Sequence, residues 1–209
     1  MFSLFPFVMI PAEIYPTTDQ LLPRSTKEER LGQRGRVFWF YGLSGSGKTT
    51  LAAALERQLH DEQLFATVLD GDNVRSGLNK DLGFSDEDRS ENIRRIAEAA
   101  KLFVGNGIVT IVSFITPRER FRRMAREIIG EDDFFEIYVK ASYETCENRD
   151  VKGLYAKVKA GKIRNFTGHQ SNFEEPKNPW LVLDTEASTP GESLEQLWAA
   201  VEPIVRPTA

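Results

Sequence analysis

The sequence is poor in the side chains that build disulfides and metal centres. Its 209 residues include one cysteine, Cys146, and two histidines. A single cysteine excludes an intramolecular disulfide and a zinc site made of cysteines, which suits a reducing compartment, so we expect the protein in the cytoplasm. The sequence also lacks a basic excess, since its formal net charge is −4. This balance gives no general attraction to nucleic acid or to an anionic membrane, and we expect neither as a partner.

The chain opens on an apolar stretch, MFSLFPFVMI, that lacks the basic residues of a signal peptide. Pro6 interrupts this stretch, and it is too short to cross a bilayer as a helix. We expect a leader, or a true start at Met9, rather than a targeting or membrane segment. Further prolines and a charged patch follow, so we predict an N-terminal arm with one short helix at residues 1–34 and one domain at residues 35–209.

Short apolar runs alternate with amphipathic segments along the rest of the chain. Strands separated by helices of this length indicate βαβ units, so we predict an α/β fold of three layers. Its sheet is mainly parallel and covered by helices on both faces. Ligands of such sheets bind beyond the carboxyl ends of the strands. The runs predict strands at residues 37–41, 65–72, 108–115, 134–141 and 180–185, and helices at 50–62, 85–107, 117–130, 142–150 and 193–205.

A glycine-rich stretch, YGLSGSGKTTLAAAL, lies between the first predicted strand and the first predicted helix after it. Gly42, four residues and then Gly47-Lys48-Thr49 fit the phosphate-binding pattern GxxxxGK[ST] in full, with the strand and the helix that it requires. The backbone amides would surround phosphate oxygens, Lys48 would reach the β- and γ-phosphates, and Thr49 would ligate Mg²⁺. The predicted cradle consists of Gly42, Leu43, Ser44, Gly45, Ser46, Gly47, Lys48, Thr49 and Thr50.

Two carboxylates follow the second predicted strand. Asp70 and Asp72 lie two apart, so in an extended segment both would point toward the nucleotide. A carboxylate there can accept a proton from an attacking hydroxyl or hold Mg²⁺. The alternative is a solvated Asp-Gly turn. With the phosphate cradle beside them, we predict that Lys48, Asp70 and Asp72 are catalytic and that Thr49 and Asp70 hold the metal.

A group of basic residues follows within about twenty positions. Arginine suits phosphate or sulfate because its parallel N–H donors match two acceptor oxygens. Arg89 and Asn92 are three apart, so they share the inward side of a helix start with Ile93. Arg94 and Arg95 are weaker candidates.

Five stretches of the chain resemble the adenylylsulfate kinases, in the same order and at similar spacing. These are GLSGSGKTTLA, DGDNVRSGLNKDLGFSDEDRSENIRRIAEAAKLF, SFITP, RDVKGLYAKVKAGKIRNFTG and NPWLVLDT. The resemblance runs from about residue 27 to about residue 203. Enzymes of that family phosphorylate the 3′-hydroxyl of adenosine 5′-phosphosulfate with MgATP. The resemblance therefore implies the same reaction, ATP and Mg²⁺ as cofactors, and a P-loop kinase-like domain with a short lid at about 147–175. It also implies a homodimer and an ATP sulfurylase as partner.

The resemblance also implies roles for single residues. Arg75, Arg89 and Asn92 would hold the phosphosulfate nucleotide, and Phe84 and Phe166 would sandwich its adenine. Asp72 would lie near the 3′-hydroxyl, with Asp70 in the Mg²⁺ region. Arg149 would lie against the ATP adenine, and Lys152 near the anionic groups. The implied acceptor pocket consists of Asp72, Arg75, Phe84, Arg89, Asn92, Ile115, Lys152, Leu154 and Phe166.

Two positions depart from the family. Thr116 stands where the family commonly has a serine described as a phosphoserine, and we assign Thr116 no catalytic role because in-line transfer needs no such intermediate. Residues 169–173 also differ from the family's pattern, at what the resemblance implies is the outer edge of the acceptor pocket. His169 reads as a surface residue of the lid, not as a base.

Other functions compatible with the phosphate cradle stay open. One is another small-molecule kinase, acting on a sugar, a nucleoside or a shikimate-like acceptor. Another is a non-catalytic regulatory partner that binds nucleotide. A GTPase is disfavoured because Leu82 stands where the guanine-specific Asn-Lys-x-Asp pattern needs an acid.

Overall fold

A computed structural model describes residues 14–15, 17–162 and 173–207 of the chain. The expectations for Met9, Phe166 and His169 lie outside these residues, as does the whole of the apolar opening stretch. The boundary between arm and domain at residues 34 and 35 stays a prediction.

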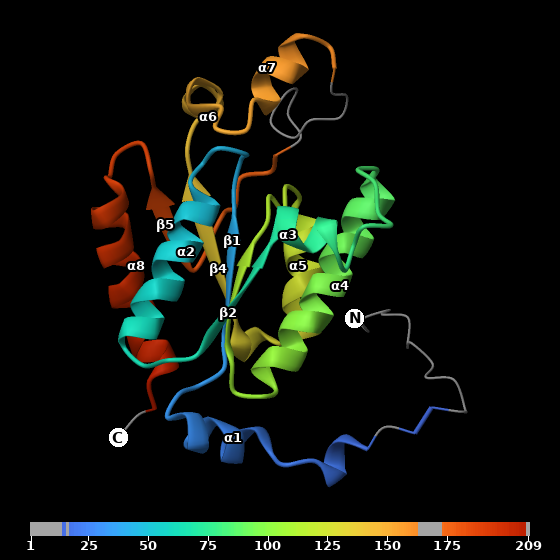
Figure 1. Cartoon of the computed structure of the whole chain (residues 1–209), viewed down its shortest axis with the longest axis vertical. Coiled ribbons are helices and arrows are strands. Elements are labelled where there is room, and N and C mark those ends of the chain that lie inside the picture. Colours follow the sequence, from blue (N-terminus) through green and yellow to red (C-terminus); the bar gives the residue numbers. More distant parts are fainter. Residues whose placement is uncertain (1–13, 16, 163–172, 208–209) are drawn as a thin grey trace.

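A five-stranded parallel sheet forms the middle layer (Figure 1). Its strand order is β2-β3-β1-β4-β5, and every neighbouring pair runs parallel. The central strand is buried along its whole length, as its uninterrupted apolar sequence predicts for a strand covered on both faces. All five carboxyl ends therefore lie at one edge of the sheet. The strands are β1 (Val37–Tyr41), β2 (Ala66–Asp70), β3 (Val109–Ser113), β4 (Phe134–Lys140) and β5 (Leu181–Asp184).

Helices cover both faces of the sheet, as predicted. One buried cluster joins the sheet to α4 and α5, and a second joins its other face to α2 and α8. Among the described residues, no helix is long and apolar enough to cross a membrane. The helices are α1 (Arg24–Leu31), α2 (Lys48–Asp61), α3 (Gly71–Ser76), α4 (Asp86–Val104), α5 (Glu119–Ile129), α6 (Tyr143–Arg149), α7 (Leu154–Lys159) and α8 (Pro190–Val205), with short 3₁₀ turns η1 (Thr18–Gln20) and η2 (Glu131–Asp133).

The helix α3 was not predicted, and it corrects the expectation of an extended Asp70–Asp72 segment. The β2 strand ends at Asp70, and its carboxylate accepts a hydrogen bond from the Asp72 amide at 3.1 Å. Aspartate is a favoured N-cap because its oxygen satisfies an amide that has no partner within the helix. The polypeptide therefore turns into a helix directly after Asp70, and Asp72 lies in its first turn.

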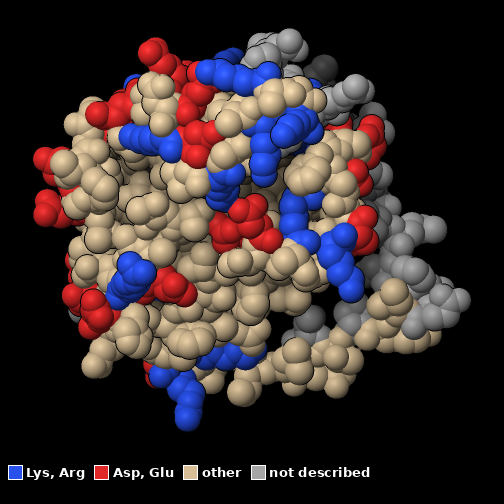
Figure 2. All heavy atoms as spheres, turned by 45° about the horizontal axis from the view of Figure 1, so that its top comes forward, with Lys and Arg blue, Asp and Glu red and all other residues tan. Residues whose placement is uncertain are grey.

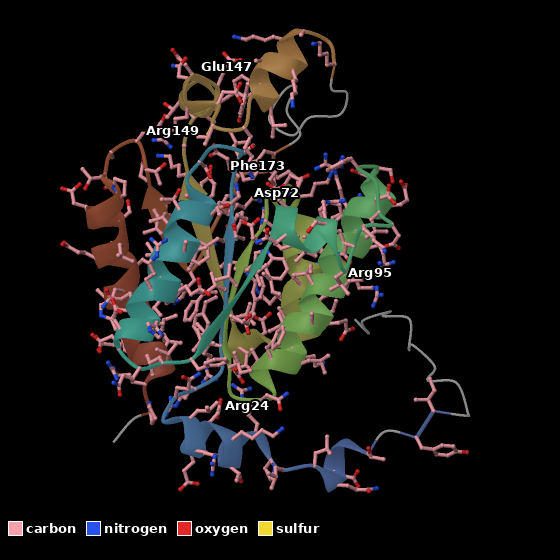
Figure 3. The ribbon with its side chains drawn as sticks, in the orientation of Figure 1. Arg24, Asp72, Arg95, Glu147, Arg149 and Phe173 are labelled. Atoms are coloured by element: carbon pink, nitrogen blue, oxygen red, sulfur yellow. The ribbon has the colours of Figure 1, made fainter. Side chains whose placement is uncertain are left out.

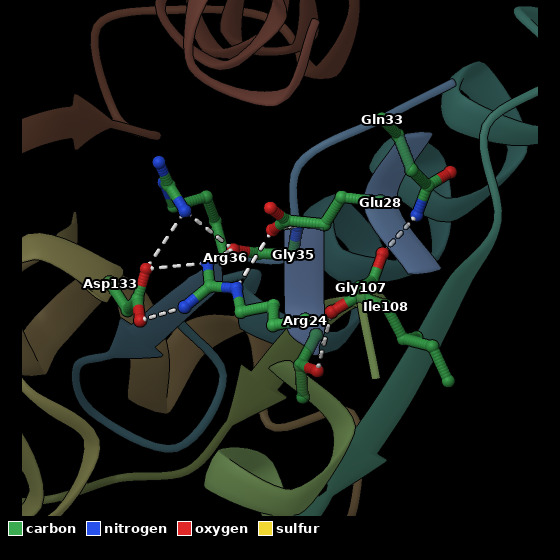
Figure 4. Close-up of polar contacts among 9 residues, drawn as sticks. Arg24, Glu28, Gln33, Gly35, Arg36, Gly107, Ile108 and Asp133 are labelled. Atoms are coloured by element: carbon green, nitrogen blue, oxygen red, sulfur yellow. Dashed lines mark hydrogen bonds and ion pairs between the residues drawn. The ribbon is translucent and has the colours of Figure 1, made fainter. Parts of the chain in front are cut away.

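The α1 helix is fastened to the end of the sheet opposite the carboxyl ends of the strands (Figures 1 and 4). Asp133 accepts hydrogen bonds at 2.8 Å from Arg24 Nη2 and from Arg36 Nη1. The Glu28 carboxylate accepts from Arg24 Nε and from the Gly35 amide, each at 2.8 Å. Gln33 is fully buried and donates to the Gly107 carbonyl at 2.8 Å. Residues 24–36 are thus joined to the body by side chains distant in sequence.

Candidate active site

A cavity of about 800 Å³ lies at the carboxyl ends of the strands. Its walls come from the glycine-rich loop, α3, the start of α4, the segment after β3 and the segment after α6. Figure 2 shows this end of the molecule, where basic side chains surround a central acidic patch. The cavity is large enough for a nucleotide-sized ligand, since pockets of this kind span about 300–1,000 Å³.

The glycine-rich loop forms one wall of this cavity. Gly42 has a φ of 149°, and a Cβ there would lie 2.3 Å from the Val139 carbonyl oxygen. Gly47 caps α2 with a φ of 101°. No other residue would fit the first position, and a side chain would strain the second. Because α2 begins at Lys48, the amides of its first turn have no partner within the helix and face an incoming anion.

Lys48 lies across this loop. Its Nζ donates to the carbonyls of Gly42 at 3.0 Å and Leu43 at 2.7 Å. The side chain is buried, and burial lowers the pKa of Lys48 to about 8. An ammonium in this position lacks full solvation, so a phosphate oxygen would be a favourable partner for it.

Thr49 and Asp70 meet at the start of α2 and the end of β2. Thr49 Oγ1 donates to Asp70 Oδ2 at 2.9 Å, and Asp70 is buried. The neighbouring Ser113 hydroxyl is buried and has no hydrogen-bond partner among the described residues. A hydroxyl and one carboxylate are the oxygen donors with which Mg²⁺ is held when phosphates supply further ligands. The residues therefore fit the predicted metal, although no group of three or more acidic, histidine or cysteine side chains placed to hold a metal ion occurs in the described part of the chain.

Asp72 lies across the cavity mouth from the segment after α6 (Figure 3). Its Oδ2 is in ion-pair contact with Lys152 Nζ. Both side chains are at least half exposed. Asp70 and Asp72 thus face different partners, a hydroxyl in the first case and a lysine in the second.

A basic and aromatic wall faces the phosphate cradle. The Arg75 guanidinium lies over the Phe84 ring, 4.6 Å from its centroid. Phe84 is 64% exposed, so it is not a core residue, and the part of its ring that Arg75 leaves uncovered is available for stacking. Arg89 Nε donates to the Phe84 carbonyl at 3.1 Å, and burial lowers the pKa of Arg89, with Arg75 adding to the effect. These positively charged groups can receive a second anion.

The predicted residues of α4 lie on two sides of the helix, as its periodicity indicated. Arg89 and Asn92 line the cavity. Asn92 is buried and accepts a hydrogen bond from Asn79 Nδ2 at 2.9 Å. Arg94 and Arg95 lie outside the cavity and pair with Glu91. Arg95 is labelled in Figure 3 on the outer side of α4.

Arg149 lies on the outer side of the cradle. It contacts Thr185, a residue that the sequence analysis did not single out. Its guanidinium donates to Thr185 Oγ1 at 3.0 Å and to the Thr185 carbonyl at 2.7 Å. Thr185 Oγ1 donates to the Ser46 carbonyl at 2.9 Å, so this threonine joins the loop to Arg149. Its place directly after β5, at the carboxyl edge of the sheet, could have identified it.

Most of the predicted residues lie around this cavity. Three cradle residues, Gly42, Leu43 and Ser46, support the loop without lining the cavity. Phe166 lies outside the described residues. The predicted residues that line the cavity are Ser44, Gly45, Gly47, Lys48, Thr49, Thr50, Asp70, Asp72, Arg75, Phe84, Arg89, Asn92, Ile115, Arg149, Lys152 and Leu154.

Comparisons with known proteins agree with this geometry. The sequence model of the adenylylsulphate kinase family matches residues 34–184. The adenylyl-sulfate kinase of Phocaeicola vulgatus is 57% identical over 192 residues, covering 92% of this chain and 94% of that protein. The structure of the Mycobacterium tuberculosis APS kinase CysC in complex with AMPPNP and APS is 44% identical, with a TM-score of 0.77, covering 81% of this chain and 98% of that one.

A second similar structure is the hexameric APS kinase from Thiobacillus denitrificans. It is 31% identical, with a TM-score of 0.62, and the match covers 82% of this chain and 29% of that one. The fold is thus that of the P-loop kinases, and the chain belongs to the adenylylsulphate kinase family.

Proposed function

We propose that this protein transfers the γ-phosphoryl group of ATP to the 3′-hydroxyl of adenosine 5′-phosphosulfate, giving ADP and 3′-phosphoadenosine 5′-phosphosulfate. The observation that carries the proposal is one cavity with two anion-binding walls, the Lys48 cradle on one side and Arg75 and Arg89 on the other. Further support is the bound AMPPNP and APS named for the similar Mycobacterium tuberculosis enzyme. Two walls of this kind suit two nucleotides facing each other.

The donor half would act by position and charge. Phosphoryl transfer needs little covalent help, so most of the catalysis comes from holding donor and acceptor in line and stabilising the charge on the phosphoryl oxygens. The amides at the start of α2 would hold the phosphates, and Lys48 would leave its carbonyl partners for the γ-phosphate. Arg149, fixed by Thr185, would lie against the ATP adenine.

Thr49 and Asp70 would hold Mg²⁺ together with the ATP phosphates. The ion would neutralise charge on the phosphates when bound.

The acceptor half would bind the phosphosulfate nucleotide by charge and stacking. Arg75 and Arg89 would neutralise its anionic groups, with Asn92 beside them. The exposed Phe84 ring would stack on its adenine, a contact worth about 1–3 kcal/mol per base. Asp72 would accept the proton of the 3′-hydroxyl as the bond to phosphorus forms. Lys152, which contacts Asp72 here, would turn to the anionic groups of the substrates.

The proposal extends to setting and assembly. We place the enzyme in the cytoplasm as a homodimer, with an ATP sulfurylase as the source of its acceptor.

Lys157 and Lys162 would be solvated charges of the lid, while Lys159 pairs with Glu147 at 3.0 Å.

An acceptor screen tests this function. Purified protein is given γ-labelled ATP, magnesium and one acceptor at a time, namely adenylylsulfate, gluconate, shikimate or a nucleoside monophosphate. We expect transfer of label to adenylylsulfate alone, where it appears as the 3′-phosphate of the product 3′-phosphoadenosine 5′-phosphosulfate. Label in another acceptor and none in adenylylsulfate would assign a different kinase. Binding of both nucleotides without any transfer would favour a regulatory protein.

A further inference from the structure

The segment after β3 holds a residue with a strained backbone, Thr116, in the acceptor wall. Thr116 has a φ of 38°. Positive φ is unusual for any residue with a side chain and is a clear outlier for a β-branched one. Thr116 is only 2% exposed, yet it lines the cavity beside Ile115 and Pro117. Strain of this kind persists where surrounding contacts over-determine the backbone, and it gathers at functional sites.

Contacts from two other elements hold the Thr116 peptide in this conformation. Trp39 Nε1 on β1 donates to Thr116 Oγ1 at 2.9 Å. Arg122 Nη1 on α5 donates to the Thr116 carbonyl at 3.2 Å. The Thr116 hydroxyl, which could carry phosphate, is therefore engaged in a buried hydrogen bond with the Trp39 side chain.

Arg122 is itself fixed. Its side chain is 4% exposed, its guanidinium lies 4.9 Å from the centroid of the Tyr41 ring, and its Nε lies 3.5 Å from Glu136 Oε1. A buried guanidinium with an opposite charge and a ring beside it has little freedom to turn. Its direction toward the Thr116 carbonyl is therefore set by the core and not by the ligand.

The same segment is joined to the phosphate cradle and to the chain beyond residue 172. The Gly42 amide donates to the Ile115 carbonyl at 3.3 Å. The Glu174 amide donates to the Pro117 carbonyl at 2.7 Å, and the Glu174 carboxylate accepts from the Glu119 amide at 2.8 Å. A shift of the Thr116 peptide would therefore move the acceptor wall relative to the donor loop.

We propose that Thr116 and Arg122 are positioning residues that hold the segment 114–117 as the fixed wall of the acceptor pocket. The Thr116 hydroxyl serves as the acceptor for Trp39 and carries no phosphate in the reaction. This inference rests on the proposed function and adds how the chain fixes the distance between its two anion-binding walls. It also gives the Thr116 hydroxyl a role, acceptance of the Trp39 hydrogen bond, that a serine hydroxyl at this position can also fill.

Three variants test the inference. Thr116→Val keeps the shape and loses the hydroxyl, Thr116→Ser keeps the hydroxyl, and Trp39→Phe removes the donor while leaving Thr116 intact. Small displacements at a reacting centre cost up to about a hundredfold. We expect Thr116→Val and Trp39→Phe to raise the KM for adenylylsulfate about tenfold or more, with the KM for ATP within about twofold. Thr116→Ser should stay near the wild type in both.

A control and a binding measurement separate the outcomes. Arg123→Gln changes the neighbouring exposed arginine on α5 and should leave both KM values unchanged. Calorimetric titration with adenylylsulfate in the presence of ADP reads acceptor binding without turnover. If the wild type binds no adenylylsulfate, the proposed function is overturned. If the wild type binds it and Thr116→Val binds it equally well, only the positioning inference is overturned.

A covalent role for Thr116 gives a different pattern. If Thr116→Val abolished turnover at saturating adenylylsulfate with its affinity unchanged, the hydroxyl would take part in the chemistry. That result would also overturn the positioning inference. We expect instead that wild-type protein incubated with γ-labelled ATP retains no label on Thr116.

Discussion

The Lys152 ammonium contacts the Asp72 carboxylate and thereby joins the segment after α6 to the first turn of α3. The two side chains are 50% and 71% exposed. Ion pairs as exposed as this one contribute at most about 1 kcal/mol to stability, because water and salt screen them. The pair can therefore open at little cost when substrates enter, which frees the carboxylate for the acceptor hydroxyl and the lysine for an anion.

Replacing Asp72 should reduce turnover without affecting the fold. We expect Asp72→Asn to lower kcat about a hundredfold or more, because the amide cannot take the proton of the acceptor hydroxyl. The free energy of unfolding should change by less than about 0.5 kcal/mol, as for other exposed positions. Steady-state kinetics and urea unfolding measure the two quantities. Asp61→Asn, at the exposed end of α2, is the matched control, and an unchanged kcat in Asp72→Asn would place the proton acceptor elsewhere.

Lys48 should be essential for transfer and dispensable for stability. We expect Lys48→Ala to lower kcat at least about a hundredfold, because the γ-phosphate loses its positive partner. Burial disfavours the ammonium and lowers the pKa of Lys48, so its removal should not lower the unfolding midpoint. Kinetics at saturating ATP and a thermal melt check both parts. Lys101→Ala, an exposed lysine near the end of α4, should behave as the wild type.

Arg89 should act on the acceptor and not on the donor. Hydrogen bonds to charged groups contribute about 1.5–3 kcal/mol, so Arg89→Ala should raise the KM for adenylylsulfate by roughly 10- to 150-fold. The KM for ATP should stay within about twofold. Arg94→Ala is the control, since Arg94 points away and pairs with Glu91. An unchanged affinity for adenylylsulfate in Arg89→Ala would contradict its place in the acceptor wall.

The sequence predicted the sheet and its covering helices because its signals there are local. The uninterrupted run at Val37–Tyr41 indicated a strand buried on both faces, and the glycine pattern after it required a strand and a helix. The helix α3 was missed because it has only six residues and follows an Asp-Gly pair that also suits a turn. The hydrogen bond from the Asp72 amide to the Asp70 carboxylate favours the helix over the turn. This bond could not be foreseen because it depends on β2 ending at Asp70.

The residues of the candidate site also differ in whether a local sequence pattern was enough to predict them. Lys48 and Thr49 could be assigned from spacing alone, because their pattern is specific. Arg75 and Phe84 needed the resemblance to the family, since arginine and phenylalanine occur in many surfaces and cores. Helical spacing had singled out Arg89, and only its role needed the resemblance. Thr185 could have been identified by its place directly after a predicted strand. Its contact with Ser46 and the fixed conformation of Thr116 were out of reach, because both depend on contacts between segments tens of residues apart.

The pairing of Glu91 should appear in the acid stability of the protein. Hydrogen bonds from Arg94 and Arg95 lower the pKa of Glu91 to about 2. The unfolded carboxylate titrates near 4.5, so the pair stabilises the fold above that pH, and the contribution is lost as the pH falls toward 2. Screening limits the effect to less than about 1 kcal/mol. Glu91→Gln should therefore unfold more readily than the wild type at pH 7 but equally at pH 2. Glu87→Gln is the control, and an equal difference at both pH values would exclude the pairing.

Asp133 should stabilise the fold while leaving catalysis alone. Its carboxylate receives Arg24 and Arg36 at the amino end of β4, opposite the cavity (Figure 4). The Asp133 side chain is 16% exposed, so its removal leaves two partly buried guanidinium groups without their anion. We expect Asp133→Asn to lower the free energy of unfolding by about 1–3 kcal/mol, measured by urea unfolding. The exposed neighbour Asp132→Asn should change it by less than about 0.5 kcal/mol. Both variants should keep wild-type KM values at a temperature where both are folded. A change in kcat for Asp133→Asn under those conditions would mean that the fastening of α1 reaches the site through the elements that run between the two ends. These are the strands and α4, whose start lines the cavity and whose end leads to the Gly107 carbonyl that Gln33 contacts.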